Sequence, residues 1–459
     1  MCDSSSDAPC SGSQPTIDPT KYERKRVPGM CVKCKVAKPN VTIRCSLYCK
    51  ECFVRTCIVK FRTATNRSRK STATPRTKLM VALSGGPSSS AMLSMMADFQ
   101  RMHIKGTAAQ PLYDDVVAGH VDESALFPEA KESLIADIAE SAGVKFMSAK
   151  LEDVFADDGE ASAFAKTIDE AAGVSQEVKD RIYARLVKSD ANVSSKERLK
   201  AFFAGLTTDT DREEMLDVLK SLLLVRLARK EGCGVLLMGD SGTRIATKIV
   251  SLASRGRGFS LPFEVGAEST WFSDVVVYRP MRDFIMKEIG FFNRWTAQKT
   301  VVVPTFTTAA PARASIGRLT EAFVVGLDQD FSSTVSTIGR TMQKLEPQES
   351  ARDALPCLLC GLPVEHNAQE WKSRLTVNRS ADAAALPCPS KSTDSTDRCS
   401  ENNAQTAADV TRLLCYSCQG IVHSAAPDTV FPGANASSYH NSQEDLRRQI
   451  EMFFIDDDE

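Results

Sequence analysis

Two pairs of cysteines near the N-terminus have the spacing of a metal site. Each pair encloses two residues, and fourteen residues separate the pairs. The four cysteines are Cys31, Cys34, Cys49 and Cys52. A tight turn points both thiolates of a pair at one centre, and two such turns supply a tetrahedron of sulfur ligands. The spacing predicts a structural zinc; the alternatives are free thiols in a mobile arm, or a ligand role for Cys45 or Cys57.

A second set of paired cysteines lies near the C-terminus and predicts a second structural zinc. Its members are Cys357, Cys360, Cys415 and Cys418. The long gap between these pairs contains an Ala-, Ser-, Thr- and Asp-rich stretch at 373–409, which we expect to be a disordered insertion that loops out. Four thiolates close a zinc site and leave no position for a reacting water, so His366 and His423 are expected to be surface histidines.

A glycine loop at residues 84–86 follows an apolar run and begins a helical pattern. Ser84, Gly85 and Gly86 can bring backbone N–H groups and a helix N-terminus against a phosphate. Pro87 suits the first helical position, where its missing N–H costs nothing. The other candidate nucleotide-binding residues are Ser88, Ser89 and Asp240.

This loop resembles the PP-loop of ATP pyrophosphatases, Ser-Gly-Gly-x-Asp-Ser, with Ser88 where that pattern has its acid. The resemblance implies an adenine nucleotide alpha-hydrolase-like fold and possible binding of ATP and Mg²⁺. Adenylation concentrates negative charge and needs Mg²⁺ and carboxylates to hold it. The missing acid therefore indicates that part of the catalytic equipment is absent, although the backbone cradle needs no acid to hold phosphate.

The segment before the glycine loop is basic. It contains several Lys and Arg residues, and no acidic residue occurs between Glu51 and Asp98. Interleaved with aromatic residues, such a patch can track a phosphate backbone. The candidate RNA-binding residues are Arg62, Arg67, Arg69, Lys70 and Arg76. The alternative interpretation is a solvated, flexible linker.

Strand and helix patterns alternate through the middle of the chain, which predicts an α/β fold with a doubly wound parallel sheet. The expected strands are 79–83, 115–121, 144–149, 235–238 and 274–278, and the principal helices are 91–102, 131–142, 213–230 and 243–254. Ligands on such sheets bind at the carboxyl ends of the strands, where the glycine loop lies.

The pattern suggests six consecutive regions. These are a disordered N-terminus at 1–28, a zinc knuckle at 29–60, a basic linker at 61–77, a PP-loop domain at 78–345 with a helical insertion at 161–205, a second zinc knuckle at 346–425, and a tail at 426–459 with a short amphipathic helix. No apolar run is long enough to cross a bilayer, and the polar, acidic N-terminus is unlike a signal peptide. We therefore expect a cytoplasmic location, where fifteen cysteines favour metal ligands over disulfides. The net charge of −1 gives no indication of a nucleic-acid partner, so only local clusters of basic residues could indicate one.

Three further segments, at 236–248, 255–258 and 274–283, resemble the cytoplasmic tRNA 2-thiolation protein 2 family when taken with the cysteine pairs. The resemblance implies a role in thiolating the wobble uridine of tRNAs, in a heterodimer with a catalytic PP-loop subunit. It also implies that sulfur arrives as a thiocarboxylate on a ubiquitin-like modifier. Active relatives resemble Gly-His-Asn-x-x-Asp after the later strand, whereas this chain has Asp240 and then Arg244.

The residues favour a non-catalytic subunit. Sulfur delivery needs several reactive cysteines, and only Cys233 occurs between Cys57 and Cys357. Cys233 and the methionine-rich helix at 92–102 are expected to be packing residues. His103 and His120 are expected to be core or rim histidines, although His120 ends a predicted strand and could face the cleft, and neither is assigned a role. Two alternatives remain: an active thiolase that uses Ser88 and Asp240 in altered roles, or a zinc-stabilised protein-interaction module without tRNA contact.

Overall fold

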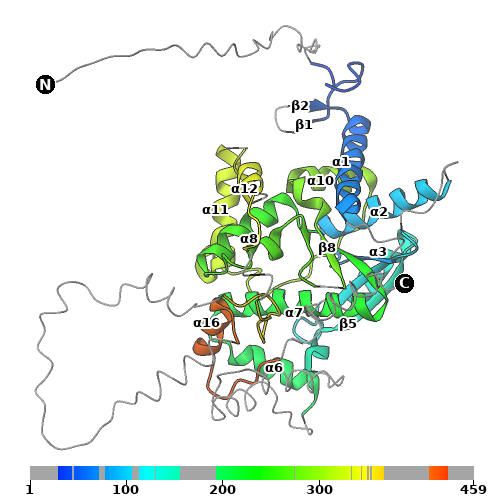
Figure 1. Ribbon diagram of the computed structural model, residues 1–459. Helices are drawn as coiled ribbons and strands as arrows, with labels where there is room; N and C mark the ends of the chain where they lie inside the picture. The colour runs from blue at the N-terminus through cyan, green and yellow to red at the C-terminus, as the bar shows by residue number, and fades with distance from the viewer. Residues whose placement is uncertain are drawn as a thin grey trace, which may run out of the picture. The chain divides into compact units, whose positions relative to one another are not determined.

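The computed structural model describes residues 29–43, 46–71, 78–105, 113–129, 131–155, 193–272, 274–331, 333–342, 344–348, 351, 354–365 and 413–432 (Figure 1). The chain divides into two compact units, Met1–Thr56 and Cys57–Glu459. The predicted disordered segments at 1–28 and 373–409, the amphipathic tail and most of the helical insertion lie outside the described residues.

The first unit is a small hairpin followed by the start of a helix. Strand β1 (Val41–Ile43) pairs antiparallel with β2 (Ser46–Tyr48). Val41 and Ile43 are buried, whereas the residue between them is exposed, as expected for a strand with one covered face. Helix α1 (Lys50–Ser71) begins in this unit and ends in the second. The predicted linker is therefore helical as far as Ser71.

The second unit contains a six-stranded sheet with the order β5-β4-β3-β6-β8-β7. The strands are β3 (Lys78–Ala82), β4 (Val116–Asp122), β5 (Lys145–Lys150), β6 (Cys233–Leu237), β7 (Glu268–Ser269) and β8 (Val276–Tyr278). All neighbouring pairs are parallel except β7–β8, which is antiparallel. The predicted α/β class with a mostly parallel sheet is confirmed, and the two-residue edge strand β7 is an addition to it.

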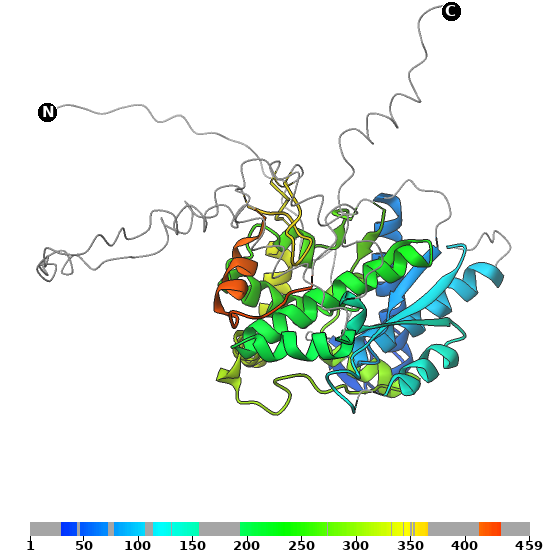
Figure 2. The same ribbon diagram turned by 90° about the horizontal axis from the view of Figure 1, so that it is seen from below.

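Alternate residues of the strands are buried on opposite faces. Met80 and Leu236 belong to one apolar cluster with the buried side of helix α7 (Asp209–Lys230). Leu79 is fully buried but lies outside that cluster, as the two-residue repeat of a strand requires. Helix α2 (Pro87–Lys105) packs against β3 and against α10 (Met286–Thr296). Figure 2 shows α7 lying along the sheet.

The remaining helices complete the second unit. They are α3 (Glu132–Ser141), η2 (Leu151–Phe155), α6 (Ser195–Gly205), α8 (Gly242–Ser254), α9 (Leu261–Val265), η3 (Pro280–Asp283), η4 (Ala312–Ala314), α11 (Ile316–Asp330), α12 (Thr334–Met342) and α16 (Tyr416–Ser424). Among the described residues, no helix is both long and apolar enough to cross a membrane.

The strand order reverses beside β3. From β3 the chain continues through α2 to β4 on one side, and it later returns through α7 to β6 on the other side. The loops that follow β3 and β6 therefore begin side by side at the carboxyl edge of the sheet and continue toward opposite ends of it. Such switch points are where open α/β sheets bind ligands.

Candidate functional site

The glycine loop turns directly after β3 and leads into α2. Gly85 has a φ of +75°, in the left-handed region that favours glycine. A Cβ on Gly85 would lie 3.0 Å from the Cγ1 of Ile135 and 3.3 Å from the Cβ of Val301. The Val301 N–H also donates to the Gly85 carbonyl at 2.8 Å. Both the backbone conformation and this close packing therefore require glycine here.

The hydroxyl groups of the loop bind the protein itself. Ser88 donates to the Gly239 carbonyl at 2.5 Å, and Ser89 donates to the Gly86 carbonyl at 3.1 Å. The hydroxyl oxygens of Ser84 and Ser89 lie 3.2 Å apart. Since Gly239 lies two residues after the end of β6, the Ser88 contact brings the two loops of the switch point together.

Asp240, the one acid in the predicted nucleotide site, lies between two protein cations. Its carboxylate oxygens are 3.4 Å from the Nζ of Lys248 and 3.6 Å from the Nε of Arg279. Burial opposes ionisation, but Lys248 and Arg279 outweigh it, so the pKa of Asp240 is lowered. The carboxylate is charged, and that charge is already balanced by side chains that would compete with Mg²⁺.

Two other acids lie at the same edge of the sheet. Asp122 ends β4 and accepts hydrogen bonds from the backbone N–H and the hydroxyl of Ser124, at 3.0 and 2.8 Å. Glu123 pairs with Lys220 at 2.5 Å. Both acids are buried. The prediction missed them, although their position directly after a predicted strand could have revealed them.

His120 is a core residue, as predicted. One ring nitrogen lies 2.9 Å from the Leu83 carbonyl, and the ring stacks on Phe146. Burial lowers the pKa of His120 and favours its neutral form.

The C-terminal cysteines converge in the core of the second unit. The Sγ atoms of Cys357, Cys360, Cys415 and Cys418 all lie within 4.8 Å of one another, and all four residues are buried. Cys360 Sγ and Cys415 Sγ are 3.7 Å apart. The Cys415 backbone N–H also donates to the Cys357 sulfur at 3.3 Å.

Local structure explains how these two pairs form. After the first pair the chain turns at Gly361, which has a φ of +69° and donates its N–H to the Cys357 carbonyl. Trp271 holds the turn by donating to the Gly361 carbonyl at 2.7 Å. The second pair occupies the N-terminus of α16, where Cys415 is the N-cap.

The N-terminal cysteines form an equally tight group in a more open setting. The Sγ atoms of Cys31, Cys34, Cys49 and Cys52 lie within 4.8 Å of one another, but Cys34 is exposed and Cys52 is half-buried. Burial opposes ionisation of Cys31, yet backbone N–H groups, with that of Cys49 foremost, lower its pKa to about 6. Cys57 is not a member of this group, and Cys45 lies outside the described residues.

Comparison with known proteins identifies the family. A family model for cytoplasmic tRNA 2-thiolation protein 2 matches residues 315–420. The protein of that name from Bos taurus is 31% identical over 85% of this chain and 85% of its own length. The chain belongs to the cytoplasmic tRNA 2-thiolation protein 2 family.

Two other relatives match a similar share of this chain and of their own length. The Danio rerio protein is 29% identical over 94% of this chain and 95% of its own length, and the Homo sapiens protein is 30% identical over 85% of each. Among solved structures, the U34-tRNA thiolase NcsA from Methanococcus maripaludis with its 4Fe-4S cluster matches 70% of this chain and 91% of that chain, at 14% identity and a TM-score of 0.48.

The basic segment of this tRNA 2-thiolation protein 2 family member is largely helical. Arg62, Arg67, Arg69 and Lys70 all lie on α1, and Arg76 lies outside the described residues. Arg62 is partly occupied by packing, because its guanidinium lies 5.5 Å from the centroid of the Phe99 ring and contacts the Met102 sulfur.

Most of the remaining residues considered for sulfur chemistry are buried in this family member. Cys233 is buried, and burial raises its pKa to about 11. Met92, Met95 and Met96 are also buried, as predicted for the core face of α2, whereas Met102 is exposed. His103 lies in α2.

Proposed function

We propose that this chain is a non-catalytic subunit of the cytoplasmic complex that 2-thiolates the wobble uridine of tRNAs. In this role it binds tRNA and a catalytic PP-loop subunit, with which it forms a heterodimer. Sulfur comes from a thiocarboxylated ubiquitin-like modifier. The names of the relatives support both the reaction class and the cytoplasmic location.

The observation that best supports the non-catalytic role is the pairing of Asp240 with two protein cations. Transfer of an adenylyl group needs carboxylates that hold Mg²⁺ against the phosphates. Asp240 is instead held by Lys248 and Arg279, and a serine hydroxyl stands where the loop acid is expected. A metal ion would have to displace two protein cations to reach this carboxylate.

The distribution of cysteines supports the same role. Cys233 is the only cysteine between Cys57 and Cys357, and its raised pKa keeps it protonated and weakly nucleophilic at neutral pH. The eight paired cysteines are gathered in two groups of four. This arrangement suits structural metal binding and leaves no paired thiols beside the glycine loop within the described residues.

Both cysteine groups have a geometry that fits zinc. A tetrahedron with zinc–sulfur bonds of about 2.3 Å has sulfur–sulfur edges of about 3.8 Å. The separations of 3.9 Å between the sulfurs of Cys34 and Cys49, and 3.7 Å between those of Cys360 and Cys415, match that edge. A four-iron cluster would need more widely separated thiolates. Zinc, when bound, would supply structural stability, because all four positions are taken by sulfur.

The test is to assay tRNA thiolation with ATP, Mg²⁺ and a thiocarboxylated ubiquitin-like donor. We expect no thiouridine from this chain alone, and thiouridine when a catalytic PP-loop subunit is added. Substantial thiolation by the lone chain would overturn the proposal. Native mass spectrometry and metal analysis of the same samples measure the heterodimer and the expected two zinc ions.

An active thiolase is the second candidate, because Asp122 and Asp240 both lie at the carboxyl edge of the sheet. It predicts ATP-dependent release of pyrophosphate by the lone chain, and loss of that release in Asp240→Ala. A matched comparison is Asp153→Ala, since Asp153 accepts a hydrogen bond from the Lys150 backbone N–H in the 3-10 turn after β5, which lies two strands from β3. No release from the wild-type chain would dismiss this candidate.

A protein-interaction module without tRNA contact is the third candidate. Filter binding of tRNA by the wild type and by a variant with Arg67, Arg69 and Lys70 changed to Glu separates it from the proposal. We expect weaker binding by the variant and a shallower dependence on salt, because each lost phosphate contact reduces counterion release. Equal binding by both proteins would favour the interaction module.

A further inference from the structure

The segment Arg255–Gly258 that follows α8 has no role in the proposed function, yet it contains the most deeply buried cation described. Arg257 is 1% exposed and is the largest of the fully buried side chains. Burying a guanidinium is costly unless every charge and hydrogen-bond donor finds a partner. The surroundings of Arg257 should therefore explain why the fold retains it.

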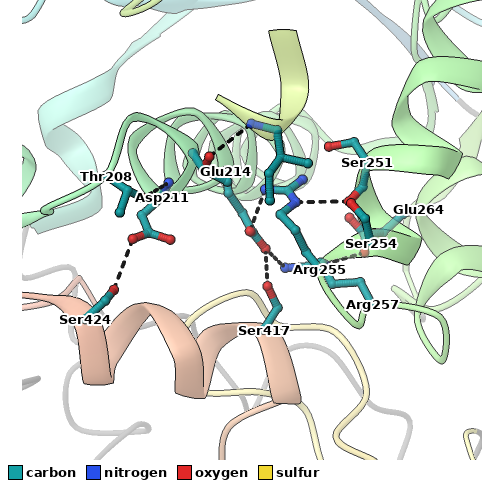
Figure 3. Close-up of polar contacts among 12 residues, drawn as sticks. Thr208, Asp211, Glu214, Ser251, Ser254, Arg255, Arg257, Glu264, Ser417 and Ser424 are labelled. Carbon is teal, nitrogen blue, oxygen red and sulfur yellow. Dashed lines mark hydrogen bonds and ion pairs between the residues drawn. The ribbon is translucent and has the colours of Figure 1, made fainter. Parts of the chain in front are cut away.

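Two carboxylates accept hydrogen bonds from only two of the three guanidinium nitrogens of Arg257 (Figure 3). Arg257 Nε donates to Glu264 at 2.8 Å, and its Nη1 donates to Glu214 at 2.7 Å. Its Nη2 is buried and has no hydrogen-bond partner among the described residues. A planar guanidinium has five N–H donors, so one of its nitrogens remains available for another acceptor.

The C-terminal cysteine group is packed against the segment that contains Arg257. Ser417, between Cys415 and Cys418, donates to the same Glu214 oxygen at 2.8 Å. A Cβ on Gly256 would lie 2.4 Å from the Tyr416 ring, so the Arg255–Gly258 segment is packed directly on the second cysteine pair. Burial disfavours the charged guanidinium, but Glu264 first, and then Cys360 and Glu214, outweigh it, and the pKa of Arg257 is raised well above its usual value.

The charge of a filled site explains why a cation is needed there. One divalent metal with four thiolates carries a net charge of about −2. The four C-terminal cysteines are all buried, so water cannot solvate that charge. We propose that Arg257 is the counter-ion of the C-terminal metal–thiolate centre, with its Nη2 turning to donate to a ligand sulfur when the metal is bound and its Nη1 linking the centre through Glu214 to helix α7.

This arrangement makes Arg257 a positioning residue for the metal ligands. Glu214 receives donors from Arg257, Arg255 and Ser417 at once, and thereby fixes the cysteine pair relative to the long helix that covers the sheet. Partners outside the ligand shell orient the ligands and tune the metal, and their loss weakens metal binding about 10–100-fold. Metal binding at the C-terminal centre is consequently coupled to the packing of the PP-loop core.

The test uses cobalt as a spectroscopic probe in the full-length chain. Changing Cys31 and Cys34 to Ser removes the N-terminal site, so that only the C-terminal centre contributes to the cobalt absorption spectrum. In Arg257→Met we expect the thiolate-to-cobalt charge-transfer band to move to longer wavelength, because a sulfur loses its N–H donor. We also expect chelator-driven release of zinc to be about 10–100-fold faster.

Arg255→Met is the matched control. Arg255 donates to the same Glu214 carboxylate at 2.5 Å and belongs to the same segment, but its other donor contact is with the Ser251 carbonyl. Its loss should leave the cobalt band at the wild-type wavelength. Equal spectra and equal release rates for the two variants would mean that Arg257 is a packing residue only, and would overturn the proposal.

Two further outcomes are distinguishable. If Arg257→Met does not fold, Arg257→Lys is used in its place, since lysine keeps the positive charge but lacks the forked donors. An unshifted cobalt band in Arg257→Lys would contradict the proposed N–H to sulfur contact. The inference rests on metal binding by the C-terminal cysteines, as in the proposed function, but not on tRNA thiolation. A complete lack of a thiolate-to-cobalt band in the wild-type centre would refute the metal site itself.

Discussion

The two four-cysteine groups have the same ligand spacing within each pair but different surroundings. The N-terminal group flanks a short hairpin and includes an exposed cysteine, whereas the C-terminal group is entirely buried. The C-terminal group joins segments that are far apart in the sequence and belongs to the apolar cluster that contains α7. The same set of four cysteines can therefore organise a local turn in one place and form part of a domain core in another.

The largest effect is expected from removing a C-terminal ligand. In Cys415→Ala we expect the second unit to lose cooperative unfolding, because structural zinc contributes about 10–16 kcal/mol in small zinc-folded peptides. Whole domains are stable by only about 5–15 kcal/mol. Thermal melting followed by circular dichroism measures this loss. A variant that melts like the wild type would show that the buried group is not needed for the fold.

The next effect concerns Glu214, which joins the C-terminal group to α7. Glu214→Gln removes a buried charge that faces Arg257 and Arg255, and breaking such a pair costs about 3–5 kcal/mol. Urea unfolding of the full chain measures the change. The control is Glu231→Gln at the end of the same helix, where the partner Lys145 is exposed and the expected loss is below about 1 kcal/mol. Similar losses in both variants would contradict the special role of the buried network.

Much of this organisation could be predicted from the sequence. The main strands were predictable because their apolar runs are short and bounded by turn residues. The cysteine pairs were predictable because two-residue spacing is a local property of the chain. The glycine loop was predictable for the same reason, and the positive φ of Gly85 gives it a physical basis.

The charged contacts could not be predicted, since they depend on which distant segments meet. Glu214 and Arg257 are polar residues in an amphipathic helix and a glycine-rich loop, and nothing in their local sequence marks them as buried. Asp240 was recognised as a candidate, but its two cationic neighbours come from other elements, α8 and the residue before η3. The short antiparallel strand β7 was missed because two residues carry no periodicity.

Thiol reactivity separates the two groups chemically. Backbone N–H groups, first that of Ala37 and then that of Val36, lower the pKa of the exposed Cys34. After brief treatment with a chelator, we expect iodoacetamide to modify Cys34 first, with a rate that falls as the pH drops through this lowered pKa. Burial raises the pKa of Cys233 to about 11 and that of Cys57 to about 12, so both should react at least about 100-fold more slowly at neutral pH.

Peptide mapping by mass spectrometry measures these rates, and the C-terminal cysteines serve as the internal control. Equal labelling of Cys34 and Cys418 would contradict the difference in exposure between the two groups. The pH series adds an independent check. A thiol whose pKa is lowered keeps its thiolate in a range where an ordinary cysteine is protonated, so reactivity near neutral pH distinguishes a lowered pKa from simple accessibility.

The smallest effect on the main unfolding transition is expected from Cys34→Ser. This change removes one ligand of the N-terminal group, so the bound zinc should fall from two ions to one. The apolar cluster around α7 contains none of the N-terminal ligands, and its melting temperature should therefore stay close to that of the wild type. Metal analysis and thermal melting of the same sample measure both quantities. A melting temperature lowered as far as in Glu214→Gln would mean that the N-terminal group supports the core as strongly as the buried network does, and the distinction between a local and a core metal centre would no longer hold.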